Sequence, residues 1–284
     1  MSSIPFSHPS NLSPPSLPHI HLVQFDMQWE DHEKNRGIVA DMLDSAHINP
    51  GDLIVLPEMF DTGFSFRTDR TNDNKGETLS FLLELADDHQ ALIQAGRTLT
   101  PCAASIGCTA KNVMSIVGPG QKILAQYTKI HPFQREAERF SPGLDIITYN
   151  WPAANISICP AICYDLRFPE LFRAGLSLNA QAFAIGACWP NVRHTHWRAL
   201  SIARAIENQA FVFAVNRTGK DPMLTYAGGS MVIGPKGDIL GELGDEQAIL
   251  SIPINPTDVT SWRDAFPAWK DARNTWQPAK IAQR

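Results

Sequence analysis

Cys163 marks an abrupt change in the character of the chain. In "ISICPAICYDLRFPE" the residues before it are apolar and predict a buried strand, whereas those after it, up to Glu170, predict a turn into a helix. A turn of this kind exposes a side chain beside the free N–H groups of a helix start, which suits a nucleophile. A lone cysteine is more often a buried apolar side chain, so its role depends on what else the chain supplies.

Two ionisable residues also follow apolar, strand-like runs. Glu58 ends "DLIVLPE", and Lys129 follows "ILAQYT". Either residue alone is typical of a solvated surface, because Glu and Lys are seldom buried without a partner. Together with Cys163 they supply a base, a cation and a nucleophile, which are the groups that acyl transfer to a thiol requires.

Alternating elements must position these residues in the first half of the chain. The hydrophobic periodicity predicts strands at 19–25 and 52–58 and helices at 31–46 and 76–89. Further strands are expected at 91–96, 112–119 and 122–131, the last two joined across "GPGQK" as a hairpin. The alternation predicts an α/β domain, and the hairpin makes its sheet mixed.

The second half continues the same alternation. We expect a helix after Cys163 as far as Leu176, strands at 180–187 and 210–216, a helix at about 193–208, a hairpin at 231–243 and a strand at 248–254. Open α/β sheets place their ligand crevice at the carboxyl ends of strands. Glu58, Lys129 and Cys163 all stand at such ends.

The domain organisation follows from where the periodicity starts and stops. Residues 1–18 are Pro/Ser-rich without periodicity, which predicts a flexible leader. No linker divides the remainder, so residues 19–284 are predicted to form a single domain, with a C-terminal extension from about residue 256.

Composition narrows the class of partner. The 284 residues are 44% hydrophobic and carry a formal net charge of -5, so there is no basic surface to bind nucleic acid or an anionic membrane. The five cysteines are odd in number and lack C-x-x-C pairs, which argues against a disulfide framework or a zinc site and favours a reducing, cytoplasmic setting. No export signal or membrane-length apolar run is visible. A small-molecule substrate fits best.

Three strings in this order, "LPEMFDTGF", "YTKIHPF" and "ICYDLRFPE", resemble the carbon-nitrogen hydrolases of the nitrilase superfamily. The Glu-Lys-Cys triad of that family falls on Glu58, Lys129 and Cys163. The resemblance runs from about His19 to Trp262. It deepens in "WPNVRHTHWRALSIARAIENQAFVFAVNRTG", which is similar to a segment of the family's bacterial omega-amidases.

The resemblance implies a fold and a fourth site residue. The fold is a four-layer α-β-β-α sandwich with mixed sheets, commonly paired as a homodimer. A second glutamate is expected between Lys129 and the nucleophile; Glu136 in "HPFQREAERFSPG" matches its place, with Glu138 as the alternative. No cofactor is implied, since the chemistry needs only the thiol, the ion pair and water.

The activity implied is that of an omega-amidase, which hydrolyses the terminal amide of short dicarboxylate monoamides such as 2-oxoglutaramate and 2-oxosuccinamate. Related activities on deaminated glutathione, N-carbamoyl compounds or nitriles stay open. So does a non-catalytic binding module on the same fold, which a shared fold alone cannot exclude.

Substrate contacts are expected around the nucleophile. The guanidinium of Arg167 suits a substrate carboxylate, although an ion pair with Asp165 or Glu170 would explain it equally well. The backbone N–H of Tyr164 is placed to hold an oxyanion. Cys188, which stands where similar omega-amidases are expected to carry Asn, and Trp189 beside it are also predicted to face the pocket.

Histidines offer two rival readings. His131 lies two residues after Lys129, so on a strand both side chains would face the same way, and a Cys–His mechanism is possible. His194 and His196 resemble a metal-binding pair, but no third ligand follows in a suitable pattern. We therefore predict no metal.

Overall fold

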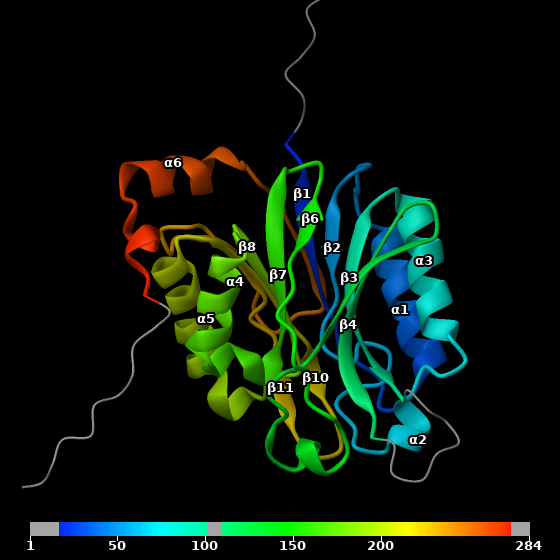
Figure 1. Ribbon diagram of the computed structural model, residues 1–284. Coiled ribbons are helices and arrows are strands. Elements are labelled where there is room, and N and C mark those ends of the chain that lie inside the picture. Colours follow the sequence, from blue (N-terminus) through cyan, green and yellow to red (C-terminus); the bar gives the residue numbers. More distant parts are fainter. Residues whose placement is uncertain (1–16, 101–108, 274–284) are drawn as a thin grey trace, which may run out of the picture.

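Two mixed β-sheets stacked face to face, with helices on both outer faces, give the molecule four layers (Figure 1). The computed structural model describes residues 17–100 and 109–273. The predicted α-β-β-α sandwich is confirmed. The predicted leader lies outside the described residues, apart from its last two, and the carbonyl of Pro18 accepts the N–H of Ile254 at 2.9 Å.

The first sheet has six strands in the order β14-β1-β2-β3-β4-β5. Strands β1, β2 and β3 run parallel, while β14, β4 and β5 are antiparallel to their neighbours. Helices α1 and α3 cover its outer face (Figure 1). The bounds are β1 (His19–Gln24), α1 (His32–Asp44), β2 (Leu53–Val55), α3 (Glu77–His89), β3 (Leu92–Leu99), β4 (Lys111–Gly118), β5 (Lys122–Thr128) and β14 (Ala248–Pro253).

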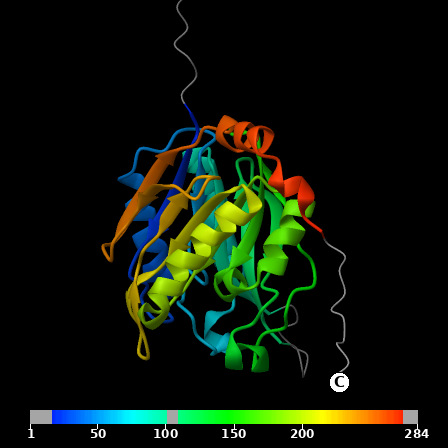
Figure 2. The ribbon, with the colours of Figure 1, turned by 90° about the vertical axis from the view of Figure 1, so that its left-hand side faces the viewer.

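The second sheet repeats this plan with six strands in the order β13-β12-β9-β8-β7-β6. Strands β7, β8 and β9 are parallel, and Figure 2 shows α4 and α5 lying across its outer face. The bounds are β6 (Tyr149–Trp151), β7 (Ile156–Ile162), α4 (Pro169–Ser177), β8 (Ala182–Ala187), α5 (His194–Asn208), β9 (Phe211–Asn216), β12 (Met231–Ile233) and β13 (Ile239–Glu242).

Short elements connect and flank the sheets. Sequence periodicity did not predict them, because three to five residues are too few to show a period. One predicted strand is shorter than expected. The strand expected at 122–131 ends at Thr128, so Lys129 and His131 lie in the loop beyond it. The short elements, with the C-terminal helix, are α2 (Thr68–Thr71), η1 (Gln134–Glu138), η2 (Cys163–Arg167), η3 (Asn191–Arg193), β10 (Thr218–Lys220), β11 (Thr225–Ala227), α6 (Thr257–Ala265) and η4 (Ala268–Asp271).

Local sequence explains how the helices start and which side they bury. The Asp31 carboxylate accepts the backbone N–H of Lys34 and so caps α1, which buries Asn35, Val39 and Leu43 at four-residue intervals. Helix α4 begins with Pro169, whose missing N–H has no partner to lose at a first helical position. Among the described residues no helix has the length and apolarity needed to cross a membrane.

The core between the sheets fixes how their strand ends meet. Fully buried side chains enter it from both sheets, among them Leu22, Trp151 and Phe213. The rings of Trp151 and Phe213 meet edge to face at 6.3 Å between centroids. Each such side chain contributes roughly 1.5–3 kcal/mol by leaving water. The carboxyl ends of β2, β7 and β8 are thereby brought to the same region of the sandwich.

Two glycines let the sheets approach closely beside Glu58. A Cβ atom at Gly96 on β3 would lie 2.6 Å from the Cα of Glu58, and one at Gly186 on β8 would lie 2.8 Å from the carbonyl oxygen of Leu56. Both distances are shorter than real Cβ contacts allow. The backbone around Glu58 is therefore held from both sheets at positions where only glycine fits.

We predict that Gly186→Ala destabilises the protein by about 1–3 kcal/mol, because the added methyl overpacks a backbone that cannot retreat. Gly37→Ala is the matched control: it lies inside α1 with nothing within 4 Å of the added Cβ, and should stabilise by about 0.5–1 kcal/mol through helix propensity. Urea unfolding of both variants checks the opposite signs. A Gly186→Ala protein as stable as wild type would contradict this account of the sheet contact.

Candidate active site

Cys163 follows β7 directly and begins η2, in a backbone conformation that non-glycine residues rarely adopt. Its φ is 47°, in the left-handed region, and its side chain is 8% exposed. The Asp165 carboxylate accepts the N–H of Ile162 at 3.0 Å and so stabilises the turn from the strand into η2. The strained turn aims the thiol into the space between the sheets' ends.

Asp165 also fastens this turn to the loop that carries Lys129. Its carboxylate accepts the hydroxyl of Tyr127 at 2.8 Å and the backbone N–H of His131 at 2.9 Å. It lies 2.8 Å from Nδ1 of His131, whose ring stacks on Phe168 with 3.7 Å between centroids. The imidazole is thus engaged with Asp165, and this arrangement does not favour the Cys–His reading.

Lys129 lies just past β5, with only 1% of its surface exposed. Its Nζ donates to Oε1 of Glu58 at 2.7 Å and to Oε2 of Glu136 at 2.8 Å. Burial alone would lower the pKa of Lys129, but the charges of the two carboxylates outweigh it and hold that pKa well above its ordinary value. The lysine is therefore a fixed positive charge.

Glu58 stands three residues beyond the end of β2 and is fully buried. Its Oε1 accepts from Lys129, and its Oε2 accepts the backbone N–H of Cys188 at 3.1 Å. Burial raises the pKa of the Cys163 thiol, and the charge of the same carboxyl group raises it further. Glu58 is therefore paired with the lysine and electrostatically coupled to the cysteine, and the three residues form one cluster.

Glu136, on η1, is the glutamate that reaches this cluster. It is fully buried and accepts the N–H of Phe133 at 2.6 Å as well as the Lys129 ammonium. Burial raises the pKa of Glu136 above its usual value; Lys129 opposes the rise and Glu58 adds to it. Glu138 instead lies at the surface beside Arg135, so the structure places Glu136, not the alternative, beside Lys129.

Asn112, at the start of β4, is a member of the cluster that sequence reasoning missed. Its Nδ2 donates to Glu58 at 2.7 Å and to Glu136 at 2.9 Å, so one amide bridges the two carboxylates. A polar residue heading the mostly apolar run "NVMSIVG" was the available signal. A buried amide at such a place needs partners, and here those partners are the two carboxylates.

The electrostatics of the cluster keep Cys163 protonated at rest. Burial and the charge of Glu58 raise the pKa of its thiol well above the ordinary value, against the opposing charge of Lys129. A thiol in this state is a poor nucleophile, because the thiolate is the reactive form. Attack on a substrate thus requires that a base take the proton as the bond forms, and Glu58 is the carboxylate whose charge acts on this thiol.

A small cavity of about 40 Å³ opens beside the thiol and gathers the predicted substrate contacts. Arg167 forms no ion pair with Asp165 or Glu170 among the described residues; its guanidinium lies 4.8 Å from the Trp189 ring centroid and 3.3 Å from Nδ1 of His196. The lining residues are Phe64, Phe133, Cys163, Tyr164, Arg167, Cys188, Trp189, Pro190, Arg193 and Leu224.

Cys188 and Trp189 continue the cavity wall from the end of β8. The Cys188 thiol donates to the carbonyl oxygen of Glu58 at 3.3 Å. The backbone N–H of Trp189 donates to the Asn216 side chain at 2.7 Å. Across residues 17–100 and 109–273, no group of three or more His, Cys, Asp or Glu side chains is placed to hold a metal ion. Cys102 and Cys108 lie outside the described residues.

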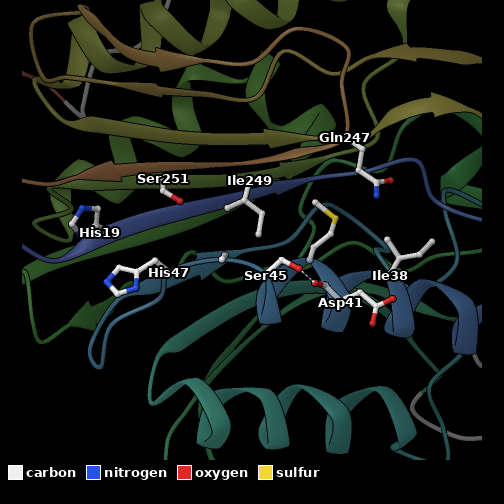
Figure 3. Close-up of a pocket in the computed structure, with 10 residues that line it drawn as sticks. His19, Ile38, Asp41, Ser45, His47, Gln247, Ile249 and Ser251 are labelled. Carbon is white, nitrogen blue, oxygen red and sulfur yellow. Dashed lines mark hydrogen bonds between the residues drawn. The ribbon is translucent and has the colours of Figure 1, made fainter.

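A larger cavity, of about 680 Å³, lies between α1 and strands β1 and β14 (Figure 3). The labelled side chains are spread along it rather than pointing at one position, and the Ser45 hydroxyl is already bonded to the Asp41 carbonyl at 2.8 Å. None of the residues in the Glu58 cluster lines it. Size alone does not make it the better candidate, because a site needs converging chemical groups.

We expect Asn112→Ala to destabilise the protein by about 1.5–3 kcal/mol for each lost bond to a charged group. The amide helps to keep the pKa of Glu136 down, so its loss should raise that pKa and move the acidic limb of the pH–rate profile upward. Asn150→Ala, at an exposed position on β6, is the control. An unchanged pH profile and unfolding midpoint would show that the amide does not support the carboxylates.

Comparison with known proteins connects this geometry to a family. Residues 20–264 match the carbon-nitrogen hydrolase family. The 2-oxoglutaramate amidase of Paenarthrobacter nicotinovorans is 35% identical over 238 residues, covering 80% of this chain and 80% of that protein. The omega-amidase YafV of Escherichia coli is 33% identical over 265 residues, covering 92% and 96% of the two chains.

Solved structures agree with this match. A CN-hydrolase superfamily protein of Xanthomonas campestris, whose structure carries an arsenic adduct in the active site, superposes with a TM-score of 0.83 at 30% identity. The match covers 93% of this chain and 100% of that one. The chain therefore belongs to the carbon-nitrogen hydrolases of the nitrilase superfamily and is an amidase, an enzyme that hydrolyses carbon–nitrogen bonds.

Proposed function

We propose that the enzyme hydrolyses the terminal amide of short dicarboxylate monoamides, such as 2-oxoglutaramate and 2-oxosuccinamate, through a thioester on Cys163. The observation that carries this proposal is Arg167, a guanidinium without a carboxylate partner among the described residues, in the same small cavity as the thiol. The similarity to a 2-oxoglutaramate amidase and to an omega-amidase supports the same substrate class.

Glu58 acts as the base in the first half-reaction. It takes the thiol proton while the sulfur of Cys163 attacks the amide carbon, which overcomes the raised pKa of the thiol. The negative charge that develops on the amide oxygen is stabilised by the Lys129 ammonium and by the backbone N–H of Tyr164. Single donors of this kind contribute roughly 10²–10³ in rate.

The same carboxyl group then reverses its role. Protonated Glu58 gives its proton to the departing nitrogen, ammonia leaves and the thioester remains. Glu58 next removes a proton from the water that attacks the thioester, and the acid is released with the thiol restored. Glu136 and Asn112 act as positioning residues that hold the lysine and the carboxylate in place throughout.

The other activities considered from the sequence are compared through the contacts of the cavity. Arg167, which has no carboxylate partner among the described residues, favours carboxylated substrates over neutral amides and simple nitriles. A non-catalytic binding module has no need for a buried lysine between two carboxylates beside a thiol, because burying such charges is costly. Ammonia release from 2-oxoglutaramate and succinamate, beside a nitrile and an N-carbamoyl amino acid, tests these alternatives against one another.

The homodimer, the cytoplasmic location and the single domain from residue 19 to 284 are predictions from the sequence alone. The three described cysteines, Cys159, Cys163 and Cys188, are free thiols, which supports a reducing setting.

We predict that Cys163→Ala abolishes ammonia release from 2-oxoglutaramate and that Glu58→Gln lowers kcat by roughly 10²–10⁴, as expected on losing a general acid–base. His131→Ala should retain most activity, because the imidazole is engaged with Asp165. Steady-state kinetics of the three variants measures this. Near-normal turnover by Cys163→Ala or Glu58→Gln would sink the mechanism, and total loss in His131→Ala with the fold intact would revive the Cys–His reading.

Arg167→Lys should raise KM for carboxylated amides by about 10-fold or more while leaving that for propionamide nearly unchanged, because lysine cannot reproduce the bidentate fork. Arg198→Lys is the control, since Arg198 is exposed on α5 and pairs with Glu242. If KM rises equally for charged and neutral amides, Arg167 has a structural role instead.

A further inference from the structure

A second arginine faces the cavity that contains Cys163. Arg193 is the last residue of η3, and it lines the same 40 Å³ space as Arg167. Neither guanidinium has a carboxylate oxygen within ion-pair distance in the part of the chain that the structure describes. Some of the other arginines are neutralised by a carboxylate, as Arg97 is by Asp73 at 2.7 Å, and others donate to backbone carbonyls instead. Among the described residues the Arg193 guanidinium has neither kind of partner.

Aromatic rings hold both arginines in place without neutralising them. The guanidinium carbon of Arg193 lies 5.4 Å from the Phe133 ring centroid, and that of Arg167 lies 5.8 Å from Tyr164. The rings of Phe133 and Tyr164 meet edge to face at 5.0 Å. A cation over an aromatic face is attracted to it but keeps its charge. Arg167 also has one side-chain hydrogen bond, to Nδ1 of His196 at 3.3 Å, which leaves its other N–H groups for a ligand.

Trp189 links the two arginines directly. Its ring lies 4.8 Å from the Arg167 guanidinium, and its indole N–H donates to the backbone carbonyl of Arg193 at 2.7 Å. Trp189 is 3% exposed, so it is a rigid support. The two guanidinium groups are therefore presented at fixed places on the rim of one cavity.

The rim has no negative charge to balance them. None of the ten residues that line the cavity is an Asp or a Glu, and Glu58 and Glu136 below are both bonded to Lys129. Two like charges facing one small volume are unfavourable until an anion enters it. The ligand that fits presents several acceptor oxygens, because arginine has five N–H donors and no acceptor.

We propose that Arg193 is a specificity-determining residue that binds the 2-oxo group of the substrate, next to the carboxylate held by Arg167. This inference rests on the proposed function and deepens it. A 2-oxo acid places a carbonyl oxygen beside its carboxylate, which a second guanidinium can bind. An α-amino acid amide such as glutamine places an ammonium there instead, and Arg193 repels it.

The two arginines thus make separable contributions. Losing the Arg167 guanidinium should lower kcat/KM for 2-oxoglutaramate and for glutaramate alike, because both substrates carry the carboxylate. Losing the Arg193 guanidinium should lower kcat/KM for 2-oxoglutaramate alone, because glutaramate has no 2-oxo group. A hydrogen bond to a charged donor corresponds to about 10–100-fold in kcat/KM.

The experiment compares kcat/KM for 2-oxoglutaramate, glutaramate, glutamine and propionamide in wild type, Arg193→Gln, Arg193→Lys and Arg198→Gln. We expect Arg193→Gln to lower the ratio of 2-oxoglutaramate to glutaramate by about 10-fold or more and to raise relative turnover of glutamine. Arg193→Lys keeps the charge, so it should lose part of the 2-oxo preference yet still reject glutamine. Arg198→Gln should behave as wild type on all four amides, and propionamide reports whether the catalytic centre is intact.

An unchanged ratio of 2-oxoglutaramate to glutaramate in both Arg193 variants would overturn the inference while leaving the proposed function standing. Wild-type turnover of propionamide without turnover of either carboxylated amide would overturn the proposed function, and the inference with it. Calorimetric binding to Cys163→Ala gives a readout without turnover. Cys163→Ala should bind 2-oxoglutaramate more tightly than glutaramate, and the double variant with Arg193→Gln should bind the two with equal affinity. Equal affinities in Cys163→Ala itself would also contradict the inference.

Discussion

The ammonium of Lys129 lies between the carboxylates of Glu58 and Glu136, with 1% of the lysine exposed to solvent. Removing charges from water is costly, and the arrangement is tolerable only because each charge has close partners. Asn112 and the N–H groups of Phe133 and Cys188 take up the remaining carboxylate oxygens. Removing one partner of such a cluster typically costs about 3–5 kcal/mol. The cluster therefore needs a scaffold that delivers all of its members to one place.

The sandwich meets this need by bringing strand ends from two sheets together. Glu58 comes from the first sheet and Cys163 from the second, and the glycines on β3 and β8 let the two backbones approach. Asp165 ties the nucleophile's turn to the loop after β5. The proposed catalytic roles follow from this arrangement: burial and Glu58 raise the pKa of the thiol, so we propose that Glu58 takes the proton of the thiol as it attacks. Outside that cluster lies the rim of the cavity, where aromatic rings contact two arginines that have no carboxylate partner among the described residues.

Local sequence signals predict some residues of the candidate site and miss others. The strand ends at Glu58, Lys129 and Cys163 were visible because long apolar runs stop at ionisable or reactive side chains. Glu136 could be separated from Glu138 only through family resemblance, because both stand in the same short polar stretch and tertiary contact alone buries one of them. Asn112 and Arg193 escaped prediction for the same reason: their partners are distant in sequence. Strands such as β6 and β10 are too short to show alternation.

The central claim is that Cys163 becomes acylated after Glu58 takes its proton. Rapid-quench mass spectrometry of the enzyme mixed with 2-oxoglutaramate tests it most directly, because it detects the thioester itself. The account predicts an acyl adduct on the peptide that contains Cys163, formed within the first turnover, and no adduct in Cys163→Ala. Full turnover with no adduct on Cys163 at any quench time would contradict it, because ammonia would then be released without the covalent intermediate on which the roles of Glu58 and Lys129 depend.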